Sequence, residues 1–262
     1  MGQGRTSRSG WVAGAMLTLL LLPADSRAAG LTGSFASGKA PYLWEDAGEI
    51  RGAEFDIVKT VLRRAGFELH PRAMPNNRLI ATFPDSDFDF ATGLQPSDLP
   101  GYCHTSAYMS YHNIAITRRA DHIALNDPAA LLHYKVAIRQ YLYQDLGLDR
   151  LGTMPAYPPG NFTEFTAQDQ QVRFFFAGRA DVIILDQTIF QWYAKRLDLL
   201  PAKQDALEVH DLFPAKHGVR AAFKDPKLCE AFDRNLAAIV ADGSYRAIWR
   251  SYGIDDVRDP GK

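Results

Sequence analysis

The sequence predicts an α/β protein built of two lobes with a cleft between them. Segments typical of strands alternate with segments typical of helices, a pattern that favours parallel sheets covered by helices. This alternation occurs twice, once before about residue 118 and once after it. A late strand-like segment, 217–223, has no strand next to it in the sequence to pair with. The simplest topology therefore inserts the second α/β unit into the first.

The first unit begins with a strand at 31–35 and a helix at 55–65. Phe55, Val58 and Leu62 recur at helical spacing in that helix, and Gly66 follows as its stop signal. The remaining segments of this unit are a strand at 67–70, a short helix at 78–83 and strands at 88–92 and 111–118.

The second unit has strands at 135–138 and 182–185, each followed by a helix, at 166–177 and 187–195. After 217–223, two helices at 226–241 and 244–252 are separated by Asp242 and Gly243. We predict that residues 29–117 and 215–262 form the first lobe and residues 118–214 the second. The two crossings, near 117–121 and 212–216, would form a hinge beside a ligand cleft.

The N-terminal segment has the features of an export signal. Arg5 and Arg8 precede an apolar run from Trp11 to Leu22, and Ser26 and Ala28 are small residues suited to signal peptidase. The run is shorter than the roughly 20 residues that a membrane span needs. We expect residues 1–28 to be cleaved and the mature protein to be periplasmic; the alternative is an uncleaved anchor.

Composition and charge exclude several other classes. The 262 residues carry 29 basic and 30 acidic side chains without a concentrated basic face, so nucleic acid is not an expected partner. The seven histidines show no metal-ligand spacing, and no cofactor motif or nucleophile is indicated. Cys103 and Cys229 can close a disulfide in an oxidising compartment; the alternative is two free thiols.

At this level of detail the chain resembles the polar-amino-acid type of periplasmic solute-binding protein, family 3, which serves ABC importers. No single matching segment is specific, but the matches follow the family's order and span nearly the whole predicted mature chain. They are Ala40–Tyr42, Asp46–Gly48, Gly52–Val58, Asp87–Asp89, Thr105–Tyr108, Gly178–Asp186, Phe232–Leu236, Asp242–Tyr245 and Trp249–Gly253. The resemblance implies a type II periplasmic-binding fold with a two-strand hinge, ligand-induced closure, a monomer, and an ABC permease in the inner membrane as partner.

The resemblance also implies a set of ligand contacts. Tyr42 and Trp44 would line the cleft from the first lobe, and Ser106 and Tyr108 fall in a segment that approaches the ligand in the family. Asp186 stands where the family places an acid against an ammonium group. The alternative role for Asp186 is a cap for the helix that begins at Gln187.

The match fails where amino-acid-binding members carry an arginine for the ligand carboxylate. This chain has Leu99-Pro100-Gly101-Tyr102 there, so Arg78 or Arg139 would have to replace that arginine. Otherwise the ligand is an amine or a quaternary cation held by Asp186 and aromatic rings. The candidate rings are Tyr42, Trp44, Tyr108, Tyr111 and Tyr141. We expect Asp186→Ala or Arg78→Ala to abolish binding with little loss of melting temperature.

The leading hypothesis is therefore a solute-binding protein that is not an enzyme. Two alternatives remain: a periplasmic enzyme of the cyclohexadienyl dehydratase type, and an accessory or sensor protein that uses the same clamp. The dehydratase would need several arginines for a dianionic ligand, and Arg78 and Arg139 are the candidates.

Overall fold

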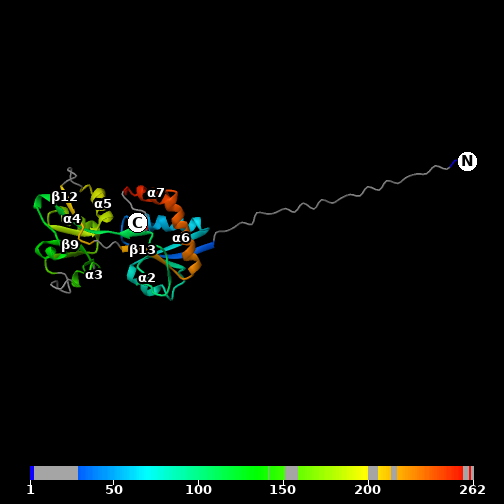
Figure 1. Cartoon of the computed structure of the whole chain (residues 1–262), viewed down its shortest axis with the longest axis horizontal. Coiled ribbons are helices and arrows are strands. Elements are labelled where there is room, and N and C mark those ends of the chain that lie inside the picture. The colour runs from blue at the N-terminus through cyan, green and yellow to red at the C-terminus, as the bar shows by residue number, and fades with distance from the viewer. Residues whose placement is uncertain are drawn as a thin grey trace.

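Two β-sheets with helices packed on them form two lobes that lie side by side (Figure 1). The computed structural model describes residues 1–2, 29–140, 142–150, 159–199, 206–213, 217–255 and 260. The predicted export signal falls almost entirely on residues 3–28, outside this part of the chain. The two-lobed α/β architecture expected from the sequence is confirmed.

The sheet of the first lobe combines strands from both ends of the chain. Its order is β4 (Phe67–Met74), β1 (Ala29–Ala36), β5 (Phe90–Leu94), β13 (His217–Phe223) and β6 (Cys103–His104), with β7 (Met109–Tyr111) also paired to β13. The helices of this lobe are α1 (Ala53–Arg64), α2 (Asn76–Thr82), α6 (Pro226–Ala241) and α7 (Ser244–Ser251). The late strand β13 thus pairs with early strands, as the inserted topology requires.

The sheet of the second lobe has the order β10 (Phe162–Phe165), β9 (Val136–Arg139), β11 (Val182–Asp186), β8 (Asn113–Arg118) and β12 (Leu207–His210). Its helices are α3 (Leu142–Asp145), α4 (Gln168–Phe176) and α5 (Gln187–Arg196). Short 3-10 turns occupy Arg119–Asp121, Pro128–His133 and Leu148–Arg150. Strand β11 is buried along its whole length because it lies in the middle of this sheet.

One predicted strand is divided between the two sheets. The segment 111–118 was expected as a single strand of the first lobe. Instead β7 pairs with β13 in the first sheet, and β8 pairs antiparallel with β11 and β12 in the second. The first crossing between the lobes therefore lies at His112 and not at 117–121. The second crossing lies between β12 and β13.

The alternation of side chains on the strands divides the core into layers. Ile183 and Leu185 of β11 belong to a cluster that continues through Tyr42 and Trp249 into the first lobe. Val182 and Ile184 point to the opposite face of the sheet and form a separate cluster. A third cluster fills the side of the first sheet under α2.

A disulfide joins the two cysteines of the chain. Cys103 lies in the edge strand β6 and Cys229 in the first turns of α6, and the sequence separation of the two residues is 126. The bridge ties a short edge strand to a helix that the chain reaches only after it has traversed the second lobe.

A β-hairpin made of two three-residue strands lies just before α1 in the first lobe. Strands β2 (Trp44–Asp46) and β3 (Glu49–Arg51) pair antiparallel across the turn at Ala47 and Gly48. Neither of these two short strands was predicted from the sequence. The hairpin carries Trp44 toward the second lobe, as described below.

Candidate functional site

A cavity of about 360 Å³ is lined by side chains of both lobes. The first lobe and the β7 crossing contribute Lys39, Asn76, Gly93, Gln95, Asp98 and Tyr111. The second lobe contributes Asn113, Arg139, Leu142, Asp145, Gln168, Leu185, Asp186 and Ile189. The wall therefore combines polar and apolar side chains, and it carries charges of both signs.

The strand topology explains why these residues meet. Gly93 lies near the carboxyl end of β5, Arg139 ends β9 and Asp186 ends β11. Because β8 runs antiparallel to β11, its first residue, Asn113, pairs with Asp186 at the same edge. In open α/β sheets, ligands bind beyond the carboxyl ends of the strands, and the cavity occupies that position.

Asp186 caps helix α5 and also contacts the first lobe. Its Oδ1 accepts hydrogen bonds from the amide of Ile189 at 3.0 Å and from the hydroxyl of Tyr42 at 2.9 Å. Its Oδ2 accepts from the amide of His112 at 2.8 Å. Burial raises the pKa of the Asp186 carboxyl, and these hydrogen bonds oppose that shift. The capping role is thus present, and the carboxylate still reaches the cavity wall.

Tyr42 lies behind the wall and not in it. The side chain is 2 % exposed, and its ring packs edge-on against Tyr111 and Trp249. Burial raises the pKa of the Tyr42 hydroxyl well above its ordinary value, so this group remains a donor to Asp186. The Tyr42–Asp186 hydrogen bond joins the two lobes directly.

Arg139 enters the cavity from the second lobe as part of an ion pair. Its Nη2 lies 2.6 Å from Oδ2 of Asp145, and its Nη1 donates to the carbonyl oxygen of Gln140 at 3.0 Å. Both partners line the cavity. Of the two arginines proposed as carboxylate contacts, Arg139 lies in the wall; Arg78 is exposed on α2 and does not belong to it.

Lys39 faces Arg139 from the first lobe. It follows β1 in the loop that leads to Tyr42, and its Nζ lies 5.2 Å from the centre of the Tyr111 ring. Burial lowers the pKa of the Lys39 ammonium; the nearby Glu54 carboxylate opposes this shift, and the Arg139 guanidinium adds to it. Two cationic groups from opposite lobes therefore act on the same space.

Glu54 and Tyr108 form a buried pair beneath this part of the wall. The Tyr108 hydroxyl donates to Oε1 of Glu54 at 2.6 Å and accepts from the amide of Gly93 at 3.1 Å. Both side chains are fully buried, and burial raises the pKa of each. Tyr108 was predicted as a ligand contact, but here it supports the strand end that carries Gly93.

Tyr111, one of the candidate rings, also lies in the cavity wall, whereas the remaining predicted contacts lie away from it. The amide and hydroxyl of Ser106 donate to the carboxylate of Asp233 on α6, at 2.9 and 3.1 Å. The Trp44 ring packs against the ring of Trp192 on α5, with 5.6 Å between the ring centres, and against the ring of Tyr252, with 5.9 Å between the ring centres. Trp44 therefore lies at a contact between the lobes. Tyr141 falls outside the described residues. Of the predicted residues, the structure brings Arg139, Asp186 and Tyr111 together in the wall.

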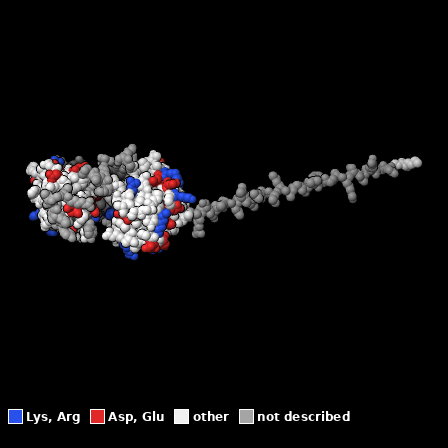
Figure 2. Space-filling view, turned by 60° about the horizontal axis from the view of Figure 1, so that its bottom comes forward, with Lys and Arg blue, Asp and Glu red and all other residues white. Residues whose placement is uncertain are grey.

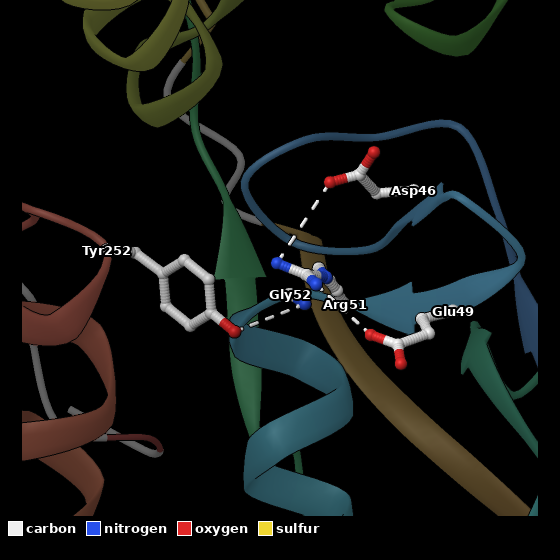
Figure 3. Close-up of polar contacts among 5 residues, drawn as sticks. All are labelled: Asp46, Glu49, Arg51, Gly52 and Tyr252. Carbon is white, nitrogen blue, oxygen red and sulfur yellow. Dashed lines mark hydrogen bonds and ion pairs between the residues drawn. The ribbon is translucent and has the colours of Figure 1, made fainter.

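The base of the hairpin is fixed to the end of the last helix (Figure 3). The amide of Gly52 donates to the hydroxyl of Tyr252 at 3.2 Å, and that hydroxyl donates to Asp56 at 2.6 Å. Arg51 lies between the carboxylates of Asp46 and Glu49, at 4.0 and 3.1 Å. The hairpin is thus held in the position in which Trp44 meets the second lobe.

Several wall residues were not singled out from the sequence. Lys39 lies just after a strand that ends at the cleft, and that placement could have indicated it. Asn76, Gln95 and Gln168 carry no comparable signal, because isolated amide side chains are common on loops and at helix starts.

Basic and acidic side chains are intermixed on the face shown in Figure 2. No group of three or more metal-ligating side chains occurs among the described residues. Within the same ranges, no helix is both long enough and apolar enough to cross a membrane.

The two lobes and the cavity between them define a two-lobed fold of the periplasmic-binding-protein type. Residues 32–255 match the family of bacterial extracellular solute-binding proteins, family 3, and the chain belongs to that family. No curated protein matches the sequence.

Solved structures with low sequence identity share this fold. A histidine kinase sensor domain with similarity to periplasmic binding proteins matches with a TM-score of 0.67 and 16% identity, over 90% of this chain and all of that one. The arginine-, lysine-, histidine-binding protein ArtJ from Geobacillus stearothermophilus matches with a TM-score of 0.62 and 16% identity, over 88% of this chain and 96% of that chain.

A third match is an ABC uptake transporter substrate-binding protein from Streptococcus pneumoniae with bound histidine. Its TM-score is 0.67 and its identity 12%, over 88% of this chain and 95% of that chain. These likenesses concern the fold.

Proposed function

We propose that this protein is an exported binding protein that captures a small polar solute, such as an amino acid or a related compound, between its lobes. The observation that carries this proposal is the cavity whose wall is shared by the two lobes. A ligand in that position contacts both lobes at once, so it stabilises the closed form over the open one.

The connections between the lobes support such a motion. The chain crosses at His112, directly between β7 and β8, and again between β12 and β13. Two crossings form a natural hinge axis. The contacts Tyr42–Asp186 and Trp44–Trp192 would form or tighten as the lobes approach.

Delivery to an ABC importer is the expected role of the loaded protein. Family membership supports it, as do fold relatives that are named as uptake-transporter proteins. We accordingly expect a periplasmic monomer, with an ABC permease as its partner. The likeness to a complete histidine kinase sensor domain supports the second candidate, a sensory role for the same clamp.

An enzyme of the cyclohexadienyl dehydratase type is less well supported. A dianionic substrate needs several cations, and Arg78, one of the two arginines considered for it, is exposed outside the cavity wall. The other, Arg139, is already paired with Asp145. We expect no turnover of prephenate or arogenate by the purified protein.

A thermal-shift screen tests the binding proposal. Amino acids, polyamines, betaines and small organic acids would each be added to the mature protein at 10 mM. A ligand that binds the folded state alone raises the melting temperature by mass action. We expect at least one class to do so; no shift with any class would contradict the proposal.

A further inference from the structure

Lys39 and Tyr111 carry hydrogen-bond donors that the protein itself leaves free at the cavity. Among the described residues, the Lys39 ammonium has neither an ion-pair partner nor a side-chain hydrogen bond, although it stands over the Tyr111 ring. The Tyr111 hydroxyl is buried and has no hydrogen-bond partner within the same set. Both residues belong to the cavity wall. The Tyr111 hydroxyl is buried without a partner in the described part of the chain, and this costs free energy that a ligand can recover.

The acidic side chains of the wall differ from Lys39 because each already accepts a hydrogen bond or forms an ion pair. Asp186 accepts three hydrogen bonds, Asp145 is paired with Arg139, and Asp98 accepts from the amide of Gln95 at 2.7 Å. An incoming ammonium group would therefore have to share carboxylates that are in use. An incoming carboxylate would instead meet the Lys39 ammonium and the Tyr111 hydroxyl, which have no hydrogen-bond or ion-pair partner among the described residues.

We propose that Lys39 and Tyr111 form an anion subsite in the cavity and that the ligand carries a carboxylate bound there. This inference rests on the proposed function and deepens it, because it excludes ligands that are purely amines or quaternary cations. It also moves the carboxylate contact away from Arg78 and from the segment 99–102.

The position of the subsite couples it to closure of the lobes. Lys39 belongs to the first lobe, Tyr111 lies in the last strand before the crossing at His112, and Arg139 comes from the second lobe. Two cations that face each other across a cavity repel, and an anion between them turns that repulsion into attraction to both. A bound carboxylate thus favours the closed form.

Matched pairs of ligands and variants test the subsite. Calorimetry and thermal shift would compare succinate with succinamide, glycine with glycinamide, and γ-aminobutyrate with putrescine, at constant ionic strength. At least one carboxylate should bind the wild type more tightly than its uncharged or cationic counterpart. Lys39→Met should weaken that carboxylate roughly 10- to 100-fold, and Tyr111→Phe by roughly two- to tenfold.

The control is Lys59→Met, the same substitution at an exposed lysine of α1, which should bind like the wild type. Retained binding of the carboxylate by Lys39→Met, or tighter binding of the amides and amines, would overturn the subsite while leaving the solute-binding function intact. Failure of every compound to bind the wild type would contradict both proposals.

The pH dependence of binding gives a readout independent of folding. The groups that act electrostatically on Lys39 are Glu54, Arg139, Asp145 and Asp98. Because the pKa of Lys39 is lowered in the free protein and an adjacent anion raises it again, carboxylate binding takes up a proton at high pH. Affinity should fall as the pH rises through the lowered pKa in the wild type, whereas any residual affinity of Lys39→Met should show no such fall.

Discussion

At the scale of single residues, Asp186 shows how one carboxylate serves two elements. It ends β11, caps α5 through the amide of Ile189, and accepts the hydroxyl of Tyr42 from the other lobe. The sequence indicated both a ligand contact and a helix cap for this residue. The geometry confirms the cap and adds a contact between the lobes that no local pattern could indicate, since Tyr42 is 144 residues away.

This geometry changes the expectation for Asp186→Ala. The substitution removes a helix cap and leaves the hydroxyl of Tyr42 and the amide of His112 without their acceptor. We predict a loss of about 2–4 kcal/mol in the free energy of unfolding. Asp186→Asn keeps an acceptor oxygen and should cost about 1 kcal/mol. Urea denaturation measures both values, and an Ala variant as stable as the wild type would refute the assigned hydrogen bonds.

The position of Lys39 near the ligand cleft can be predicted from the sequence, but its contacts cannot. Its place after the first strand suggests proximity to a ligand, by the general rule for α/β sheets. That its ammonium stands over the Tyr111 ring and lacks an ion pair among the described residues depends on the tertiary fold. The same holds for Trp44, whose partner Trp192 lies on a helix of the other lobe.

At the scale of elements, helix α1 directly follows Gly52, a glycine that no other residue can replace without strain. Gly52 has φ of 133°, and a Cβ atom at this position would lie 2.1 Å from the carbonyl oxygen of Tyr42. The same residue donates its amide to Tyr252, as Figure 3 shows. The start of α1, the hairpin and the end of α7 therefore meet at one backbone position.

We predict that Gly52→Ala lowers the free energy of unfolding by roughly 3 kcal/mol, because it combines an unfavourable φ with a backbone clash. Gly160→Ala is the matched control, since a Cβ there meets no atom within 4 Å. It should change stability by less than about 0.5 kcal/mol. Equal stability of the two variants in thermal or chemical denaturation would contradict the assigned backbone conformation.

Elements with a continuous local signal were predicted well, and those defined by distant partners were not. The apolar run 182–185 followed by a helix after Asp186 was identified because a buried central strand needs no alternation. The segment 111–118 contains no residue that signals a break, so its sequence predicts one strand. Its division at His112 is determined by pairing with β13 on one side and with β11 and β12 on the other. Those partners lie far away in the sequence.

At the scale of the whole molecule, the inserted topology produces both the cleft and its hinge. The second α/β unit interrupts the first, so the chain must cross between the lobes twice. Strands β5, β9 and β11 end at the cavity, and residues at or near those ends line it. The division of the chain into two interleaved lobes followed from the order of elements, whereas the place of the first crossing required the pairing of β8.

Small-angle X-ray scattering of the mature protein, with and without a saturating carboxylate identified in the ligand comparison, tests the central claim most directly. We predict a smaller radius of gyration for the loaded protein, because a ligand between the lobes holds them together. At a ligand concentration that just saturates the wild type, the decrease should be smaller in Lys39→Met, because the variant is then only partly loaded. A loaded wild-type protein with the radius of gyration of the free protein would contradict closure around the ligand.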